Sequence, residues 1–198
     1  ELVRLLSQHP HVEVTAVCGS SSAGQPLHEA RPSLRGAGEL MVREFDATEI
    51  ASLCDVAFLA VPHGTSAAPA AALHERGVQV IDLGSDFRLR DADEARRYYG
   101  GEPAPQALRQ TAHYSLPELT GAPPQNCQLI ANPGCFATAL SLALAPLAPH
   151  LSSDASVQAF GVTGSSGSGA AATTKVHHSF RRTSFTAYKA LRHQHLGE

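Results

Sequence analysis

Residues 56–83 read VAFLAVPHGTSAAPAAALHERGVQVIDL and determine the fold that we expect. The two ends of this stretch, residues 56–61 and 78–83, are short apolar runs of the kind that form buried strands. Between them, residues 65–76 are rich in alanine, which favours a helix. A strand, a helix and a second strand in this order predict a parallel β-α-β unit in a sheet that is covered on both faces.

The alternation of strands and helices continues on both sides of this unit. Further strands are expected at residues 11–18, 128–131 and 157–162, and further helices at residues 1–8, 46–53 and 136–148. The last of these helices is apolar along most of its length and is expected to be buried. Residues 88–125 are rich in Arg, Pro and Tyr and predict a short helix followed by an extended excursion. We therefore expect an α/β protein with a Rossmann-like, doubly wound parallel sheet.

Loops follow three of the expected strands, at residues 20–22, 62–64 and 84–86. Ligands of open parallel sheets bind outside the carboxyl ends of the strands, so we expect these loops to converge on one crevice that holds a dinucleotide. The first loop, Ser20, Ser21 and Ser22, offers hydroxyl and amide groups where NAD enzymes place a carboxylate for the ribose hydroxyls. This difference favours NADP as the cofactor.

The sharpest local motif is NPGCFATA, residues 132–139, in which a strand passes through a Pro-Gly turn into a helix that begins at Cys135. Backbone N–H groups and the positive end of the helix dipole favour a thiolate there and form an oxyanion site. We interpret Cys135 as a nucleophile. The other cysteines, Cys18, Cys54 and Cys127, are expected to be buried as small apolar residues.

A nucleophilic thiol needs a proton carrier, and LRHQH at residues 191–195 supplies two imidazoles beside a guanidinium. In an extended segment, alternation places His193 and His195 on one face. A surface histidine cluster is the alternative interpretation. Taken with His177 and His178, these residues match no zinc spacing, so no metal is expected.

The Gly/Ser loop at residues 161–169 and Arg88 each have two possible interpretations. The loop GVTGSSGSG, residues 161–169, includes Gly164, Ser165 and Gly167, and its N–H groups can bind an anion or a nicotinamide carboxamide, although a flexible linker has the same composition. Arg88 can bind an anionic substrate or form a structural ion pair with Asp86, and we favour the ion pair slightly.

The composition argues against several classes of function. The 198 residues carry a formal net charge of −3 and are 43% hydrophobic, so no basic field attracts nucleic acid or an anionic membrane. The four cysteines show no paired spacing, and no signal peptide or membrane-spanning run opens the chain, which is typical of a cytoplasmic protein. Small-molecule chemistry is therefore expected.

With these residues in hand, the chain resembles the N-acetyl-gamma-glutamyl-phosphate reductases, the arginine-pathway members of the aspartate-semialdehyde dehydrogenase group. The resemblance runs almost from end to end. The segments that carry it, in chain order, are ELVRLLSQHPHVEV, LAVPHGTS, VIDLGSDFRLRD, RRYYG, HYSLPEL, IANPGCFATA, GVTGSSGSGA and YKALRHQHLGE. Eight such segments in the right order are far more specific than any one of them.

The resemblance implies an NADP-dependent enzyme with Cys135 as its catalytic thiol and one or both of His193 and His195 as acid and base, His195 being preferred. The residues implied along NADPH are Ser20, Ser21, Ser22, Pro62, Gly164, Ser165 and Gly167. The residues expected at the substrate are Arg88, Asn132 and Arg192. In the implied reaction, the thiolate expels inorganic phosphate from an acyl phosphate, and hydride from NADPH reduces the resulting thioester to the semialdehyde.

The resemblance also implies a domain organisation. Residues 1–132 correspond to an NADP-binding domain, and residues 133–198 begin an α+β substrate and dimerisation domain, so a homo-oligomer, dimer or tetramer, is expected. The family opens with a strand and a Gly-rich turn, and this chain starts just after them; the family also continues beyond residue 198. We therefore expect a longer parent enzyme.

Three alternatives remain open at this point. A reductase of carrier-linked aminoadipyl phosphate in lysine synthesis shares the family's motifs. A Cys-His thiol hydrolase shares the helix-start cysteine and the remote histidine. A non-catalytic dinucleotide-binding module shares the fold. Within the arginine-pathway reading, the residues do not distinguish an N-acetyl from an N-succinyl substrate.

Overall fold

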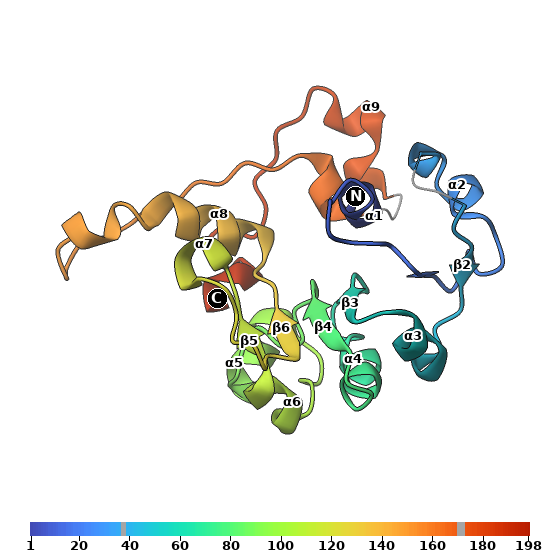
Figure 1. The fold of residues 1–198 in the computed structure, drawn as a ribbon. Coiled ribbons are helices and arrows are strands. Elements are labelled where there is room, and N and C mark those ends of the chain that lie inside the picture. The colour runs from blue at the N-terminus through green and yellow to red at the C-terminus, as the bar shows by residue number, and fades with distance from the viewer. Residues whose placement is uncertain (37–38, 170–172) are drawn as a thin grey trace.

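The parallel sheet expected from the sequence forms the centre of the computed structural model, which describes residues 1–36, 39–169 and 173–198 (Figure 1). Its four strands lie in the order β3-β4-β6-β5 and are all parallel. Their bounds are β3 Val56–Leu59, β4 Gln79–Asp82, β5 His113–Tyr114 and β6 Leu129–Ala131. The expected α/β class with a parallel sheet is confirmed.

The β-α-β unit forms as predicted, with α4 spanning Ala67–His74 between β3 and β4. Apolar side chains from both strands and from the helix meet in one core, in which Val80 and Ala70 are fully buried and Leu73 is nearly so. The helix α3, Ala47–Leu53, also forms as predicted, and the Asp46 carboxylate caps it by accepting from the N–H groups of Thr48 and Glu49. The central β-α-β unit and α3 therefore form as their patterns predict.

The amino-terminal strand is shorter than expected and belongs to a separate sheet. β1 covers only Val17–Cys18 and pairs in parallel with β2, Val42–Arg43, which the sequence did not predict. The expected strand residues His11, Val12 and Glu13 are exposed, so no burial holds them in a ladder. The remaining short elements of this part are α1 Leu2–Leu6, α2 Leu27–Ala30 and η1 Pro32–Leu34.

The segment expected as a short helix and an extended excursion is more structured than predicted. It contains α5 Ala92–Tyr99, α6 Gln106–Thr111, the edge strand β5, and α7 Pro117–Thr120. Asp91 caps α5 through the N–H groups of Asp93 and Glu94, and Gly100, with φ of 74°, ends the helix. Elements of two to eight residues are too short to show a hydrophobic period, which explains the wrong prediction.

The helix α8, Cys135–Leu144, follows β6, but the expectation that it is buried was wrong. Only Ala137 of α8 is buried, and Leu142 is exposed. The prediction of a strand at residues 157–162 was also wrong. These residues form no strand, because they are exposed and have no strand partner in the described part of the chain. The later elements are η2 Ala148–His150, η3 Ser165–Ser168, η4 Thr174–Val176, α9 His178–Arg181 and η5 Gln194–Gly197.

The carboxyl-terminal turn η5 returns to the sheet after this irregular path. Figure 1 shows it in red beside α8, and it packs against both α5 and α8. This return brings residues 193–198 to the turn between β6 and α8. Among the described residues, no helix is long and apolar enough to cross a membrane.

Candidate active site

Cys135 is exposed and is the first residue of α8, with Gly134 as the N-cap, as the strand-turn-helix motif predicts. The preceding Asn132 is held by its N–H, which donates to the Asp82 carbonyl at 2.9 Å, and by its side-chain amide, which donates to the Pro133 carbonyl at 3.0 Å. The thiol therefore stands at the end of a strand that is fixed in the sheet. The other thiols are less buried than expected, since Cys18 is exposed and Cys54 and Cys127 are half-buried.

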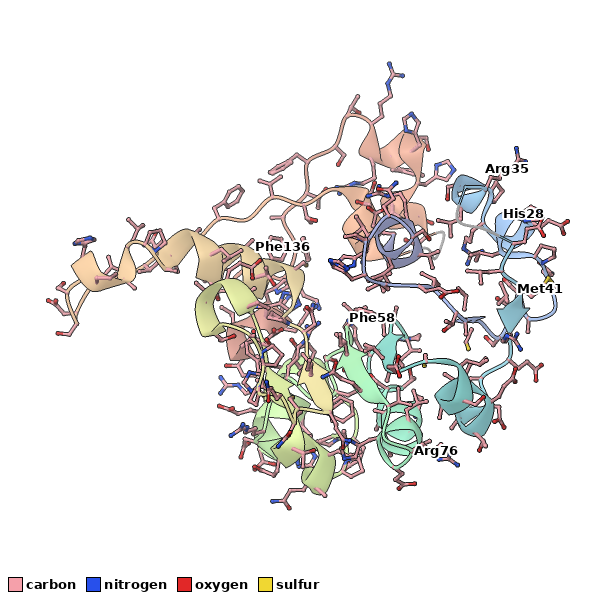
Figure 2. All side chains as sticks on the ribbon, viewed as in Figure 1. His28, Arg35, Met41, Phe58, Arg76 and Phe136 are labelled. Carbon is pink, nitrogen blue, oxygen red and sulfur yellow. The ribbon has the colours of Figure 1, made fainter. Side chains whose placement is uncertain are left out.

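The imidazole of His195 lies against this helix start. Its Nδ1 accepts a hydrogen bond from the Phe136 N–H at 3.2 Å, and Figure 2 shows Phe136 in the crowded region at the start of α8. Because Nδ1 is an acceptor, the proton of the neutral ring lies on Nε2. Burial lowers the pKa of His195 to about 4 against the opposing charge of Glu198, so the ring is neutral near pH 7.

His193 lies beside His195, as the alternation predicts. The centroids of the two rings are 4.6 Å apart. The His193 ring also meets the Phe136 ring edge to face, with 5.0 Å between their centroids. The Nδ1 of His193 accepts from the His195 N–H at 3.2 Å, and burial, followed by the charge of Lys189, lowers the pKa of His193. Arg192, immediately before His193, is exposed. The predicted thiol and both predicted imidazoles are thus brought to one place.

Arg88 forms an ion pair, but its partner is Glu198, and the expected pairing with Asp86 was wrong. The Arg88 guanidinium donates to Glu198 at 3.1 Å and to Tyr99 at 3.2 Å. It also donates to the carbonyls of Asn132 at 2.8 Å and Leu83 at 2.9 Å. Because the buried guanidinium binds these four groups, its role in this structure is to hold them together. Glu198 carries no recognisable motif, so sequence reasoning missed it.

Asp86 instead joins two of the three loops that were expected to converge. Its carboxylate accepts from the Gly64 N–H at 2.7 Å and from the Ser66 N–H at 2.9 Å. Gly64 has φ of 82°, a conformation that glycine adopts without strain. The loops after β3 and β4 are therefore tied together. No hydrogen bond in the described part of the chain joins Ser20, Ser21 or Ser22 to them.

The residues expected to hold a dinucleotide lie in exposed loops. Ser20 and Ser21 are exposed after β1, and Pro62 is exposed after β3, where its carbonyl accepts from the Thr65 hydroxyl at 2.6 Å. A Cβ built on Gly84 would lie 2.8 Å from the Ser66 hydroxyl oxygen, so backbone comes unusually close at this strand end. Hydroxyl groups without a carboxylate at residues 19–22, together with small residues at the strand ends, fit a phosphorylated dinucleotide.

The third predicted cofactor segment is separate from these loops. Gly164, Ser165 and Gly167 are exposed around η3, and among the described residues their hydrogen bonds stay within residues 163–169. Ala170, the last residue of the Gly/Ser motif, lies outside the described residues. A role of this segment at the nicotinamide stays a prediction.

Comparison with known proteins identifies the family. Residues 1–126 match the semialdehyde dehydrogenase NAD binding domain, and residues 135–198 match the semialdehyde dehydrogenase dimerisation domain. The chain belongs to the semialdehyde dehydrogenase family. The helix-start cysteine therefore opens the dimerisation domain, and the strands of the parallel sheet before β6 lie within the NAD binding domain of this family.

Relatives in the semialdehyde dehydrogenase family match over the whole chain. An N-acetyl-gamma-glutamyl-phosphate reductase of Bacillus subtilis is 40% identical, and one of Marinobacter nauticus is 39% identical. A protein of Nitrosopumilus maritimus named as a LysW-L-2-aminoadipate/LysW-L-glutamate phosphate reductase is 38% identical. The chain covers 58%, 57% and 57% of these relatives, respectively, and thus spans less than two thirds of their length.

A solved structure supports the fold. The aspartate semialdehyde dehydrogenase of Candida albicans, crystallised with NADP, matches with a TM-score of 0.50 and 19% identity. The match covers 75% of this chain and 42% of that chain. At this identity the likeness concerns the arrangement of strands and helices, which agrees with the Rossmann-like sheet described above.

The first prediction concerns Gly134, over which the His195 ring lies. A Cβ built on Gly134 would fall well inside van der Waals contact of that ring, whereas the Gly134 backbone, with φ of −67°, accepts alanine without strain. In the complete gene product, Gly134→Ala should therefore displace His195 and lower kcat by about 100-fold. Gly36→Ala is the control, because, apart from its chain neighbours, no atom of the described residues lies within 4 Å of its Cβ position. Equal kcat values for the two variants would contradict the prediction.

The second prediction concerns Asp82, which ends β4 and is fully buried. Burial raises the pKa of Asp82 from its ordinary value of 3.8. The native state thus holds this proton more tightly than the unfolded state, and the resulting stability is present at low pH and lost as pH rises through the raised pKa. Asp82→Asn removes that loss.

The free energy of unfolding of Asp82→Asn, relative to that of the wild type, should therefore increase between about pH 4 and about pH 7. Urea unfolding of the complete gene product at the two pH values measures it. A relative stability that is unchanged, or that decreases, would show that Asp82 does not titrate in this way.

Proposed function

We propose that this chain carries the nucleotide domain and the reactive thiol of an NADP-dependent reductase of arginine biosynthesis. Its reaction converts an N-acyl-gamma-glutamyl phosphate into the N-acyl-glutamate 5-semialdehyde. The observation that carries the proposal is the exposed Cys135 at a helix start, with the neutral His195 ring on the adjacent Phe136 N–H. The names of the relatives from Bacillus subtilis and Marinobacter nauticus supply the substrate class.

The thiol does the covalent chemistry. The Cys135 sulfur attacks the acyl carbon, and the carbon–oxygen bond to phosphate breaks. Inorganic phosphate departs, and the acyl group remains on Cys135 as a thioester. The Cys135 and Ala137 N–H groups have no acceptor among the described residues and can hold the acyl oxygen, whose negative charge the helix start favours. NADPH supplies the hydride that reduces the thioester.

In this proposal, His195 is the acid and base of the reaction. As a neutral ring it can donate a hydrogen bond from Nε2 to a substrate oxygen, and once it has taken the proton of the Cys135 thiol it can return that proton to the departing phosphate or, when the hemithioacetal collapses to the aldehyde, to the Cys135 sulfur. His193, whose ring meets that of His195 edge to face with 4.6 Å between the centroids, is the second candidate for this role. Asn132 and Arg192 remain proposed substrate contacts, whereas Arg88 acts through the groups it positions. The proposed NADP contacts are Ser20, Ser21, Ser22, Pro62, Gly164, Ser165 and Gly167.

The organisation of the parent enzyme is part of the proposal. We place the boundary between the nucleotide domain, residues 1–132, and the substrate domain, residues 133–198, at the turn before Cys135. The match of residues 135–198 to a dimerisation domain supports a homo-oligomer. We propose that it is a dimer or tetramer and that it works in the cytoplasm. The many exposed apolar side chains of residues 157–196, among them Phe160 and Phe185, agree with a surface that other parts of such an assembly cover.

A second candidate rests on the relative from Nitrosopumilus maritimus, whose name gives a carrier-linked aminoadipate or glutamate phosphate as substrate. The same thiol and imidazoles serve either substrate, because the reacting group is an acyl phosphate in both. Membership of a dehydrogenase family with an NAD binding domain argues against a thiol hydrolase. The exposed thiol with an imidazole nearby argues against a non-catalytic module.

The reverse reaction of the complete gene product tests the proposal. N-acetyl-glutamate semialdehyde, N-succinyl-glutamate semialdehyde and carrier-linked aminoadipate semialdehyde are each mixed with inorganic phosphate and NADP. We expect phosphate-dependent formation of NADPH with an N-acyl-glutamate semialdehyde. Turnover with the carrier-linked substrate alone selects the second candidate, and absence of phosphate-dependent NADP reduction with all three overturns the proposed function.

A further inference from the structure

The Glu198 side chain is fully buried, with 0% of its surface exposed. A buried carboxylate is costly unless it is paired and hydrogen-bonded. Here one oxygen, Oε1, accepts from Arg88 at 3.1 Å and from the Tyr99 hydroxyl. The other, Oε2, accepts from the Tyr114 hydroxyl at 3.0 Å and from the Gly134 N–H at 2.7 Å. Both oxygens are therefore satisfied by donors from distant parts of the chain.

These donors link Glu198 to the sheet. Arg88 follows β4, Tyr99 ends α5, and Tyr114 belongs to the edge strand β5. Burial, reinforced by the carboxylate of Glu198, raises the pKa of both tyrosines, so their hydroxyl groups remain protonated donors. The cluster is thus a set of fixed donors around one negative charge.

Glu198 also faces the two groups of the site. The Gly134 N–H that it binds belongs to the residue immediately before Cys135. Its Oε1 lies 3.9 Å from the Nε2 of His195, the ring nitrogen that carries the proton when Nδ1 accepts from Phe136. At this distance the carboxylate makes no hydrogen bond to the ring, but its negative charge favours a proton on the facing Nε2. No other carboxylate in the described part of the chain lies within 4 Å of a His195 ring nitrogen.

We propose that Glu198 is a positioning residue of this site, whose carboxylate holds the turn before Cys135 by a hydrogen bond and acts on the ring of His195 through its charge. It acts through these two groups and does not touch the substrate. The inference deepens the proposed function and rests on it for its kinetic test. It assigns a purpose to a buried ion pair that the reaction itself does not use.

The test is Glu198→Gln in the complete gene product. Glutamine keeps the shape of the side chain but removes the charge that the four donors surround. We expect kcat per folded molecule to fall between about 10-fold and 100-fold, with KM for the acyl phosphate changed by less than about threefold. Glu102→Gln is the matched control, because that glutamate is exposed on the surface and pairs with Arg96. We expect the control to keep wild-type kcat.

A purely structural role predicts a different result. If Glu198 is purely structural, Glu198→Gln lowers the midpoint of thermal unfolding and the folded fraction, but its kcat per folded molecule stays within about twofold of that of the Glu102→Gln control. This outcome overturns the proposal. If Glu198→Gln does not fold, Tyr114→Phe decides, because it removes one hydrogen bond to the same carboxylate. A fall in kcat of at least about threefold at unchanged KM supports positioning; a smaller change overturns it.

Alkylation of Cys135 by iodoacetamide, followed across pH by mass spectrometry, needs no enzymatic activity. Removing the negative charge beside Gly134, and leaving Arg88 without its counter-charge, favours the thiolate. The midpoint of alkylation should therefore move to lower pH in Glu198→Gln and stay in place in Glu102→Gln. An unmoved midpoint overturns the positioning role, whereas a moved midpoint in a protein without reductase activity overturns only the proposed function.

Discussion

Replacing Cys135 by serine should abolish phosphate-dependent NADP reduction by the complete gene product, with a fall in rate of at least about 1,000-fold. A serine hydroxyl at the same helix start is a far weaker nucleophile than a thiolate, and it is also a poorer leaving group when the reduced intermediate collapses. The reverse assay described above measures the rate. Mass spectrometry should at the same time find an acyl adduct on Cys135 of the wild type and none at the serine of the variant.

Cys127→Ser is the matched control for this variant. The Cys127 thiol is half-buried, and its sulfur contacts the Leu129 carbonyl at 3.3 Å, away from the helix start. We expect it to keep wild-type activity. If Cys135→Ser retained a rate comparable to that of Cys127→Ser, covalent catalysis by Cys135 would be excluded.

Replacing Arg88 by methionine should lower the free energy of unfolding by about 3–5 kcal/mol, because it leaves the Glu198 carboxylate buried without its counter-charge. Urea unfolding of the complete gene product measures the loss. Arg96→Met is the control. Arg96 pairs with Asp93 and Glu102 at the surface, where an ion pair contributes less than about 1 kcal/mol.

The double variant Arg88→Met with Glu198→Gln distinguishes an unpaired charge from lost packing. Removing both charges should recover a large part of the stability lost in Arg88→Met, because no ionised group then remains unpaired in the core. If the double variant were less stable than Arg88→Met by the full cost of Glu198→Gln alone, the two side chains would not interact in solution.

The central elements could be predicted because their signals are local. The apolar runs of β3 and β4, the alanine-rich α4 and the Pro-Gly turn before Cys135 each lie within a dozen residues of sequence. A pattern of this length determines an element without reference to the rest of the chain. The position of the thiol at a helix start followed directly from it.

The elements that were missed depend on partners that sequence does not display. β2 and β5 have two residues each, too few to show alternation, and their existence depends on β1 and β6. The opposite error occurred at residues 157–162, where an apolar alternation has no neighbouring strand among the described residues. Strand formation is settled by pairing, which a single stretch does not record.

The site was predicted in part for the same reason. The cysteine and the two histidines stand in short motifs, but the side chains that hold them do not. Arg88 and Glu198 are separated by 110 residues, and neither position has a local signal for the pairing. Asp86, two residues from Arg88, was the nearer candidate in sequence, and the fold uses it for the N–H groups of Gly64 and Ser66.

The return of residues 193–198 to the sheet has a consequence for biosynthesis on the ribosome. The ribosome makes Cys135 before the irregular segment between α8 and η5. The two imidazoles and Glu198 come after that segment, about 60 residues after Cys135. Until that tail docks, a nascent chain has the thiol without its proton carrier and Arg88 without its counter-charge. In the proposed mechanism, the thiol therefore meets its proton carrier only when residues 193–198 dock.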